Sequence, residues 1–375
     1  MEIDKLLERT FIIAEIGKNF IQTEDSKSVE EYLDNAKELV LKAKRAGADA
    51  VKFQTHYVHD EVLNIEFTSP HFTKKGSDRY SWVSRNTHAT PFLEFWKPLK
   101  KFCDEQKIMF MSTPMSRGAA KRLNKLTPEL WKVGSGDILD FVTLDYLAET
   151  KKPIIFSSGM STLEETEKAI AFLNSKAAQP ILLHCVSKYP CPPEELNLNT
   201  IKFYNEKFDI PIGFSDHSIE NDAAVAAVAL GAKVIEKHFT LSRELYGADH
   251  KVSQTPEEFK QLVERIREVE SNPKNQQEIL TSELTKRSLG TSEKTLNKDE
   301  AVFRPLFRKS LIAGKTIPKG TTITKEMIYA MRPQQHAGGL PSEEFPNVLG
   351  KTTKIELKRF DPITKEVIEW KKSVL

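Results

Sequence analysis

Short apolar runs alternate with helical patterns along the first 275 residues of the chain. Each run is rich in apolar and β-branched residues, and the stretch after it repeats its apolar positions at helical spacing. The predicted strands are 11–17, 48–55, 108–112, 131–135, 153–157, 180–186, 212–215 and 233–238. Eight β-α units in succession, with strands hydrophobic almost throughout, predict a closed (β/α)8 TIM barrel rather than an open sheet.

Several helices carry sequence signals of their own. A helix is expected over about 29–45, and a small, apolar one over 221–231 that would pack tightly on the sheet. The run from Ser161 to Glu164 has the spacing of a capping box. Thr255-Pro256-Glu257-Glu258 combines an N-cap, a proline at the first helical position and an acidic first turn, so a helix should run over 256–270.

The character of the chain changes after Ser271, where polar and charged residues replace the apolar periodicity. Further on, short β-like runs and a Pro-Lys-Gly turn return, with a short helix expected around 324–328. We predict three parts: a barrel domain over 1–275, a linker over 276–303 and a small β-rich domain over 304–375.

A long connection, residues 56–90, follows the second predicted strand. It contains histidine, tyrosine, tryptophan, serine and threonine but little periodicity. Loops of this length are usually lids or disordered segments. Because it leaves the carboxyl end of a barrel strand, where such barrels place their sites, we interpret it as part of a substrate cover.

Composition narrows the class of protein. The net charge is only +2, with acidic and basic residues interspersed, so neither a nucleic-acid nor a membrane surface is expected. The three cysteines form no CxxC pair, which indicates reduced thiols rather than a disulfide framework or a zinc ribbon. The first residues lack the apolar core of a signal peptide, and no run approaches the length of a membrane helix. A cytoplasmic protein fits these features.

Two histidines end the seventh and eighth predicted strands. His217 follows Asp216, and His238 lies two residues after Glu236. Capping of a strand is the simpler interpretation for a single histidine. Two histidines at the same ends of neighbouring parallel strands can converge, which is the geometry of a divalent metal site or of an acid/base pair. The matched positions favour a site.

Other polar residues also lie at or near the predicted strand ends. A lysine at a strand end is usually a surface group, but Lys52 and Lys132 have apolar neighbours, and a buried ammonium needs an anionic partner. Ser-Gly segments offer backbone N–H groups to a phosphate or carboxylate, although any tight turn would also use them. His184 and Cys185 are interpreted as core residues. The candidates are Glu15, Lys52, Gln54, Thr113, Lys132, Ser135, Asp137, Ser157, Ser158, Ser187, Tyr189, Ser215, Asp216, His217, Glu236 and His238.

Nine short motifs follow one another along the chain: residues 14–19 (AEIGKN), 51–54 (VKFQ), 112–114 (STP), 132–136 (KVGSG), 157–160 (SSGM), 183–185 (LHC) with Tyr189-Pro190, 212–218 (IGFSDHS), 235–239 (IEKHF) and 249–250 (DH). In this order they resemble the N-acetylneuraminate (sialic acid) synthase family. The tail from Phe307 through Arg332-Pro333 is similar to that family's C-terminal SAF, or antifreeze-like, domain. The resemblance therefore covers nearly the whole chain.

The resemblance implies a reaction and a set of roles. Phosphoenolpyruvate would condense with an N-acyl mannosamine-type aldose to give a nine-carbon 2-keto sugar acid and phosphate. It implies a divalent metal, manganese in the family, at His217 and His238, acid/base or positioning roles for Glu15, Asp137 and Glu236, and a domain-swapped homodimer. It assigns phosphoenolpyruvate to Lys52, Thr113, Lys132, Ser135, Ser157 and Ser215, and the sugar to Gln54, Tyr189, Asp249 and, from the tail of a partner subunit, Arg332.

Three departures from the family pattern leave the acceptor sugar open. Phe20 stands where the family commonly has histidine, Ser187 where bacterial members often have asparagine, and Gln-Gln-His follows Arg332-Pro333. All three are expected near the sugar, so the product could be N-acetylneuraminate, a legionaminate-like sugar or another nonulosonate. A Schiff-base aldolase using Lys52 or Lys132 is a second class. A polysaccharide-binding protein with an inactive barrel is a third, and the intact set of polar residues argues against it.

Overall fold

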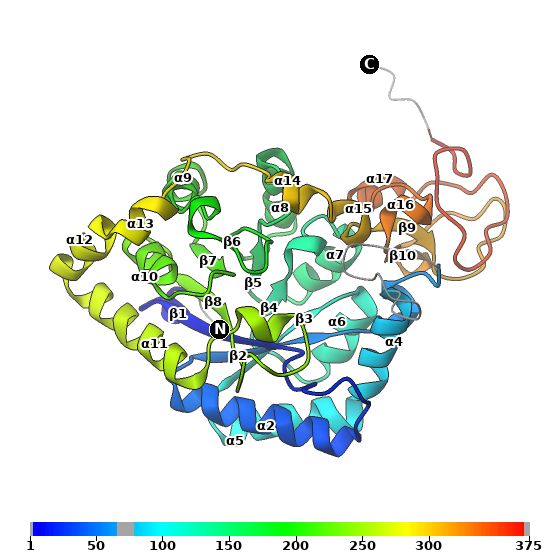
Figure 1. Ribbon diagram of the computed structural model, residues 1–375. Helices are drawn as coiled ribbons and strands as arrows, with labels where there is room; N and C mark the ends of the chain where they lie inside the picture. Colours follow the sequence, from blue (N-terminus) through cyan, green and yellow to red (C-terminus); the bar gives the residue numbers. More distant parts are fainter. Residues whose placement is uncertain (1–2, 66–78, 371–375) are drawn as a thin grey trace.

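The computed structural model describes residues 3–65 and 79–370, and its main feature is a ring of eight parallel strands (Figure 1). The hydrogen-bonded order is β3-β2-β1-β8-β7-β6-β5-β4, and β3 and β4 lie against each other. The strands are β1 Phe11–Gly17, β2 Ala50–Thr55, β3 Met109–Pro114, β4 Trp131–Val133, β5 Ile154–Ser157, β6 Pro180–Cys185, β7 Ile212–Asp216 and β8 Val234–His238. The predicted TIM barrel is confirmed.

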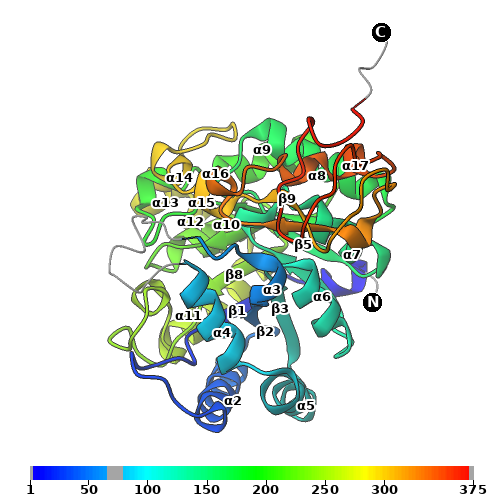
Figure 2. The same ribbon diagram turned by 90° about the vertical axis from the view of Figure 1, so that its right-hand side faces the viewer.

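Helices surround this ring and cover its outer face (Figures 1 and 2). They are α2 Val29–Arg45, α5 Lys97–Glu105, α6 Arg117–Asn124, α7 Phe141–Glu149, α8 Leu163–Ser175, α9 Asn199–Lys207, α10 Asp222–Ala229 and α11 Pro256–Ser271. Short elements connect or precede them: α1 Ile3–Leu6, α3 Val58–Glu61, α4 Arg79–Ala89, the π-helix η1 Phe92–Trp96, and the 3₁₀ turns η2 Ser135–Asp137, η3 Pro193–Glu195 and η4 Asp249–Val252.

Helix starts follow the predicted chemistry, with one shift in register. Thr255 is the expected N-cap of α11, and together with Glu258 it forms a capping box. At α8 the box is formed by Thr162 and Glu165, so the prediction of Ser161 was wrong by one residue. The reason is that the Ser161 hydroxyl donates instead to the carbonyl of Gly159, 3.1 Å away.

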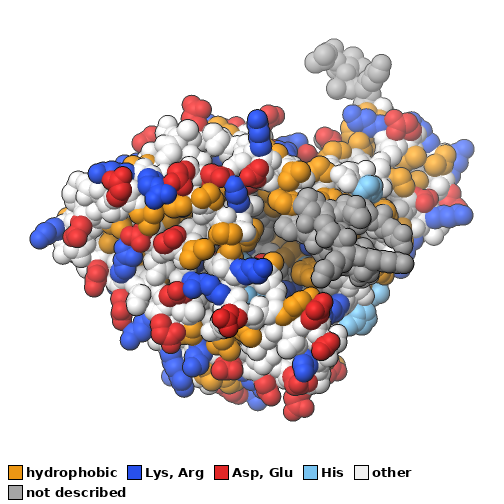
Figure 3. Space-filling view, viewed as in Figure 1, with side chains coloured by type: hydrophobic (Ala, Val, Ile, Leu, Met, Phe, Trp, Pro, Cys, Tyr) orange, Lys and Arg blue, Asp and Glu red, His pale blue; other side chains and the backbone are white. Residues whose placement is uncertain are grey.

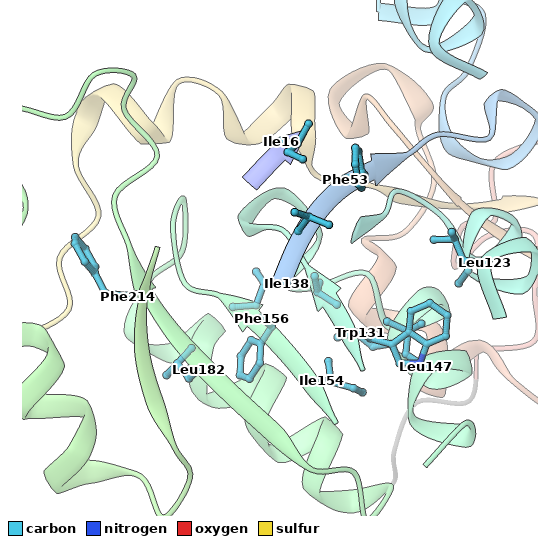
Figure 4. Close-up of a cluster of buried hydrophobic side chains, with 14 of the residues drawn as sticks. Ile16, Phe53, Leu123, Trp131, Ile138, Leu147, Ile154, Phe156, Leu182 and Phe214 are labelled. Carbon is cyan, nitrogen blue, oxygen red and sulfur yellow. The ribbon is translucent and has the colours of Figure 1, made fainter. Parts of the chain in front are cut away.

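The core forms two layers, as the alternation of side chains along a strand requires. One layer fills the space between the sheet and the helices, and Figure 4 shows part of it, including Phe53, Trp131 and Phe156. Phe20 belongs to this layer, with its ring 4.9 Å from that of Phe95, so the expectation that Phe20 lies near the sugar was wrong. The other layer includes Phe11, Ile13, Ala50, Met111, Leu130, Ile155, Ile181, Leu183 and Val234, with residues of α1 packed against it.

The C-terminal region, residues 304–370, packs beside α7 (Figures 1 and 2). It contains an antiparallel pair, β9 Ser310–Ala313 and β10 Ile328–Met331. Its short helices and turns are α15 Arg304–Phe307, η5 Lys325–Met327, α16 Gln334–Ala337, η6 Ser342–Glu344 and α17 Phe345–Val348. The segment before it, expected as a linker, carries α12 Pro273–Thr281, α13 Glu283–Ser288 and α14 Lys298–Ala301.

The long connection after β2 is described at both ends, and its middle, residues 66–78, lies outside the described residues. Val62 pairs with Arg332 in a parallel bridge, so the start of the connection lies along the C-terminal region. No helix among the described residues is long and apolar enough to cross a membrane.

Candidate active site

The inner face of the barrel changes from apolar to polar toward the carboxyl ends of the strands. Successive inward positions on a strand are two residues apart. Beyond the apolar inner residues Phe11, Ile13, Ala50, Met111, Leu130, Ile155, Leu183 and Val234, the next inward positions are Glu15, Lys52, Thr113, Lys132, Ser157, Cys185, Glu236 and His238. Seven of the predicted site residues therefore lie in one polar layer of the barrel, together with Cys185.

Two lysines and two carboxylates occupy the centre of this polar layer. Lys52 Nζ lies 2.8 Å from Glu15 Oε2 and 3.6 Å from Glu236 Oε1. Lys132 Nζ lies 3.4 Å from the same Glu236 oxygen. All four side chains are buried. The carboxylate partners that buried lysines require are thus supplied by the chain itself.

The environment shifts the pKa values of the two carboxylates, Glu15 and Glu236, in opposite directions. Burial raises the pKa of Glu15, and the attraction of Lys52 does not offset it. Burial also acts on Glu236, but Lys132 and Lys52 together bring its pKa below the ordinary value. Burial lowers the pKa of Lys132, whereas the pKa of Lys52 is raised because Glu15 and Glu236 outweigh burial. Glu15 is consequently the carboxylate more ready to take up a proton.

Hydroxyl groups complete this central network. Lys52 Nζ donates to Thr113 Oγ1 at 3.2 Å, and Lys132 Nζ donates to Ser157 Oγ at 2.8 Å. Ser215 Oγ donates to Glu236 Oε1 at 3.1 Å. The structure thus joins five of the six residues assigned to phosphoenolpyruvate, and several of these groups could turn toward an anionic ligand.

The sixth residue, Ser135, lies in an adjoining group of small polar side chains. Its hydroxyl is 3.5 Å from Cys185 Sγ. A Cβ added at Gly159 would lie 2.2 Å from Ser187 Oγ, 2.6 Å from Ser135 Oγ and 3.0 Å from Cys185 Sγ. These three side chains therefore surround the Gly159 backbone so closely that a Cβ there would require them to move. The polar contacts of Cys185 were missed, because its apolar neighbours in sequence indicated a core residue.

The two histidines converge as predicted from their strand positions. Their ring centroids are 5.4 Å apart, and the Tyr189 ring lies 4.0 Å from that of His217. His217 Nδ1 is 2.8 Å from the Val186 carbonyl, to which it can only donate, so in the neutral ring Nε2 carries the lone pair. His238 Nδ1 is buried without a hydrogen-bond partner.

These two imidazoles offer ring nitrogens to a common point, and their pKa values differ. Burial acts on His217, but Cys185 and the Val186 carbonyl bring its pKa above the ordinary value. Burial, together with the charge of His217, brings the pKa of His238 well below its ordinary value, so its ring is neutral. Within residues 3–65 and 79–370 no group of three or more His, Cys, Asp or Glu side chains is placed to hold a metal ion. The pair fits a site in which the protein supplies two nitrogen ligands, and substrate or water supplies the rest.

Three of the four residues assigned to the sugar gather beside Glu15. Gln54 Nε2 donates to Glu15 Oε1 at 2.9 Å. A Cβ at Gly17 would lie 3.1 Å from Glu15 Oε1, 3.2 Å from Gln54 Nε2 and 3.6 Å from Asp249 Oδ2, and the φ of Gly17 is +53°. Burial raises the pKa of Asp249. Tyr189, stacked on His217, is 48% exposed and borders the same space.

Asp137 and Arg332 lie together in a second ion cluster. Arg332 Nη2 is 2.5 Å from Asp137 Oδ1, and Lys309 Nζ is 3.0 Å from the same oxygen and 2.7 Å from Asp140 Oδ2. Arg332 and Lys309 hold the pKa of Asp137 below its ordinary value despite burial. In this structure Arg332 thus pairs with a barrel residue of its own chain, whereas the resemblance implies that it reaches a partner's barrel.

A group of buried charges at the start of the long connection was not predicted. His56 Nδ1 lies 2.8 Å from Glu61 Oε2, and Arg79 Nη2 lies 3.7 Å from Glu61 Oε1. Lys18 is also buried, and its Nζ has no hydrogen-bond partner. Lys18 and His56 directly follow the first two predicted strands, 11–17 and 48–55, which was an available signal. Nothing in the connection's irregular pattern marked Glu61 or Arg79.

The surface above the ring of strands is hollowed beside the segment drawn in grey, with hydrophobic side chains along its border (Figure 3). The connection and the C-terminal region meet on this side of the barrel, where Leu63 N donates to the Arg332 carbonyl at 2.9 Å.

Comparison with known proteins gives consistent matches over both parts of the chain. The NeuB family model matches residues 39–278, and the SAF domain model matches residues 308–369. Human N-acetylneuraminate-9-phosphate synthase is 32% identical, over 96% of this chain and 92% of that protein. The N,N'-diacetyllegionaminic acid synthase of Legionella pneumophila is 33% identical, over 96% and 94%. The crystal structure of spore coat polysaccharide biosynthesis protein SpsE from Bacillus subtilis superposes with a TM-score of 0.75 at 31% identity, over 97% and 96%.

Proposed function

Because the chain belongs to the NeuB family, whose relatives include sialic and other nonulosonic acid synthases, we propose that it condenses phosphoenolpyruvate with an N-acyl mannosamine-type aldose. The products would be a nine-carbon 2-keto sugar acid and inorganic phosphate. The observation that carries the proposal is the buried pair Lys52 and Lys132, with hydroxyl groups on both ammonium groups, beside two converging histidines.

The lysine pair suits a ligand that has both a phosphate and a carboxylate. Phosphoenolpyruvate carries negative charge on both its phosphate and its carboxylate. Because Glu15 and Glu236 already neutralise Lys52 and Lys132, binding of this anion requires a change in the protonation of the cluster. Uptake of a proton by Glu15, whose pKa burial raises, would release Lys52 toward the ligand. Glu236, whose pKa the lysines lower, would stay ionised and hold both ammonium groups in place.

His217 and His238 would hold the divalent metal, which we propose to be Mn²⁺. When bound, such a cation supplies Lewis-acid polarisation of the aldehyde oxygen. The contribution of the chain is orientation: the Val186 carbonyl fixes the tautomer of His217, and Tyr189 packs against its ring.

The reaction needs two bonds formed and one broken. The methylene carbon of phosphoenolpyruvate attacks the aldehyde carbon, and the aldehyde oxygen takes a proton. Water then adds to the former enol carbon, and phosphate leaves with cleavage of its bond to that carbon. Of the two water protons, one replaces the proton given to the aldehyde oxygen, and the other leaves with phosphate as the ketone forms. Glu15 lies between Lys52 and Gln54, so we propose it as the group that holds or moves a proton at these steps.

Gln54, Tyr189 and Asp249 would bind the acceptor sugar. Because the relatives are named for different products, two acceptors are candidates. A diacetamido sugar leading to a legionaminate is the second candidate, favoured by the similar identity of the Legionella synthase. The human relative is named for a 9-phosphate product, so a phosphorylated acceptor belongs in the same comparison.

Product analysis tests both the reaction and the acceptor. The chain is incubated with phosphoenolpyruvate, Mn²⁺ and a panel of N-acyl hexosamines, their 6-phosphates and diacetamido sugars. We expect phosphate release only with all components present, and a product mass equal to aldose plus pyruvate. Absence of phosphate release with every acceptor would refute the proposal. A pyruvate adduct trapped by borohydride would instead support a Schiff-base aldolase at Lys52 or Lys132.

Removal of the histidines tests the metal site separately. His217→Ala and His238→Ala should each abolish metal-dependent turnover and weaken Mn²⁺ binding measured by electron paramagnetic resonance, while the circular dichroism spectrum stays unchanged. Mn²⁺ binding equal to that of the wild type would contradict this assignment.

We also propose a domain-swapped homodimer, in which Arg332 would leave Asp137 of its own chain and reach the sugar bound by the partner subunit. We further propose a cytoplasmic location, where phosphoenolpyruvate is available and the three buried free cysteines stay reduced. Sedimentation of the purified chain tests the dimer. Mixed dimers of Arg332→Ala with an inactive His238→Ala subunit should recover activity if Arg332 acts across the interface.

A further inference from the structure

A strap, residues 289–303, crosses the loops that follow β6 and β5 on its way to the C-terminal region, and Figure 1 shows it passing from α13 to α14. It is held at its start, where Asn199 N donates to the Leu289 carbonyl at 3.0 Å and Thr291 N donates to Asn197 Oδ1 at 3.0 Å. Near its end, Lys188 Nζ pairs with Asp299 Oδ2 at 2.9 Å. The strap is therefore bound to the barrel along its length.

One carboxylate of the strap enters the barrel loops. Glu300 lies on α14 and is 1% exposed. Its Oε1 accepts a hydrogen bond from Ser187 N at 2.6 Å and another from Met160 N at 2.9 Å. Its Oε2 accepts from Asn297 N at 3.4 Å, within the capping box of α14. A single buried oxygen thus joins the loop after β5 to the loop after β6.

These two loops carry part of the proposed phosphoenolpyruvate site. The first begins with Ser157, whose hydroxyl accepts from Lys132. Its Gly159 faces the hydroxyl of Ser187 in the second loop so closely that a Cβ would lie 2.2 Å from that oxygen. The two loops therefore pack closely at this point, and Glu300 bridges them from the side of the strap.

The charge of Glu300 has its own compensation within the strap. Lys294 is buried, and its Nζ lies 3.5 Å from the carbonyl of Cys185, in the second loop. The attraction of Glu300 opposes the effect of burial on this lysine. The strap therefore brings a carboxylate to backbone N–H groups and an ammonium to a backbone carbonyl of the same loop, which is more than a passive connection between domains requires.

We propose that Glu300 is a positioning residue for phosphoenolpyruvate, setting the separation of loops 157–160 and 185–187 and so linking the strap before the C-terminal region to the anion site. The inference rests on the proposed function. Glu300 touches neither substrate in this scheme and acts through Ser157, Gly159 and Ser187. A purely structural residue would affect stability alone, so the test must separate ligand affinity from stability.

The experiment measures phosphoenolpyruvate binding by calorimetry, without acceptor or Mn²⁺, in the full chain and in three variants. Glu300→Ala leaves two buried N–H groups unpaired and should raise the Kd for phosphoenolpyruvate at least tenfold. Glu300→Gln keeps an oxygen for both N–H groups but loses the charge, and should raise it two- to fivefold. Asp299→Asn is the matched control, because Asp299 is the neighbouring carboxylate of the strap but is exposed, and its Kd should equal that of the wild type.

Kinetics supply the second measurement. In both Glu300 variants KM for phosphoenolpyruvate should rise in the same order as Kd, with KM for the acceptor within twofold of the wild type. The positioning role would be overturned if Glu300→Gln bound phosphoenolpyruvate with the Kd of the wild type. It would also be overturned if Glu300→Ala had a lower Tm but an unchanged Kd. If Glu300→Ala does not fold, Glu300→Gln decides. If the wild-type chain bound no phosphoenolpyruvate, the proposed function itself would be refuted. Equal binding by the wild type and the variants would refute only the role of Glu300.

Discussion

Lys18 offers a sharp test of the structure because its ammonium is buried next to the polar layer without a hydrogen-bond partner. Its Nζ lies 5.6 Å from the centroid of the Phe20 ring and 5.9 Å from that of Trp96. Burial lowers its pKa from 10.5 to about 7, although Glu61 and Glu15 pull in the opposite direction. We predict that Lys18→Met is more stable than the wild type, and that this difference in the free energy of unfolding is larger at pH 6 than at pH 9.

The sign and size of the effect follow from proton linkage. The folded-state pKa of Lys18 lies below the unfolded-state value, so between pH 7 and pH 10.5 the folded chain binds fewer protons and its stability rises with pH. At 1.36 kcal/mol per pKa unit, the buried charge costs about 5 kcal/mol at pH 6 and about 2 kcal/mol at pH 9. The advantage of Lys18→Met should therefore shrink by about 3 kcal/mol over this range.

Thermal unfolding at matched scan rates measures this change. At about 2 cal/mol/K per residue, a chain of 375 residues has an unfolding entropy of about 0.8 kcal/mol/K. The difference in Tm between Lys18→Met and wild type should then fall by about 3 to 4 °C from pH 6 to pH 9. Lys27→Met, at an exposed lysine of the same loop, is the control and should show a constant difference. A constant difference for Lys18→Met as well would refute the burial of a titrating ammonium there.

Two further substitutions test the two sides of the site. Gly159→Ala should raise KM for phosphoenolpyruvate at least tenfold and leave KM for the acceptor unchanged, because a Cβ would lie 2.2 Å from Ser187 Oγ; equal KM values in steady-state assays would contradict the close approach. Asp137→Asn should lower Tm by about 4 °C or more in calorimetry, because loss of one member of a buried ion cluster costs about 3–5 kcal/mol. Arg332 loses its paired carboxylate, and Lys309 keeps only Asp140. An unchanged Tm would show that these cations do not depend on Asp137.

The barrel was predictable because its signals are local and repeated. Each β-α unit has its own apolar run and helix start, so a shift of one residue, as at Thr162, leaves the topology intact. The structure of the C-terminal region was harder to predict from the pattern of hydrophobic and polar residues. Only β9 and β10 form a regular pair there, and isolated bridges such as that between Ile317 and Leu357 connect much of the rest.

The polar layer was predictable from register, whereas the outer contacts were not. An inward residue on a strand stays inward two positions later, so Lys52 and Glu236 could be placed in one layer before their contacts were known. The pairing of Asp137 with Arg332 depends on how the C-terminal region packs on the barrel, which no local pattern encodes. The same holds for Glu300, which lies in a segment whose composition indicated only a linker.

The polar layer at the carboxyl ends of the strands lowers the stability that the barrel could have, and this loss indicates a role in binding. The barrel is stabilised by its apolar layers, and buried ion pairs add little to that, since well-packed apolar replacements are often neutral or stabilising by about 1–4 kcal/mol. Lys52, Lys132, Glu15 and Glu236 fill positions directly beyond the apolar inner layer that apolar side chains could fill at lower cost. A ligand that needs two ammonium groups in a dry site accounts for this choice. The pairing of the lysines with Glu15 and Glu236 keeps both ammonium groups ordered within the barrel.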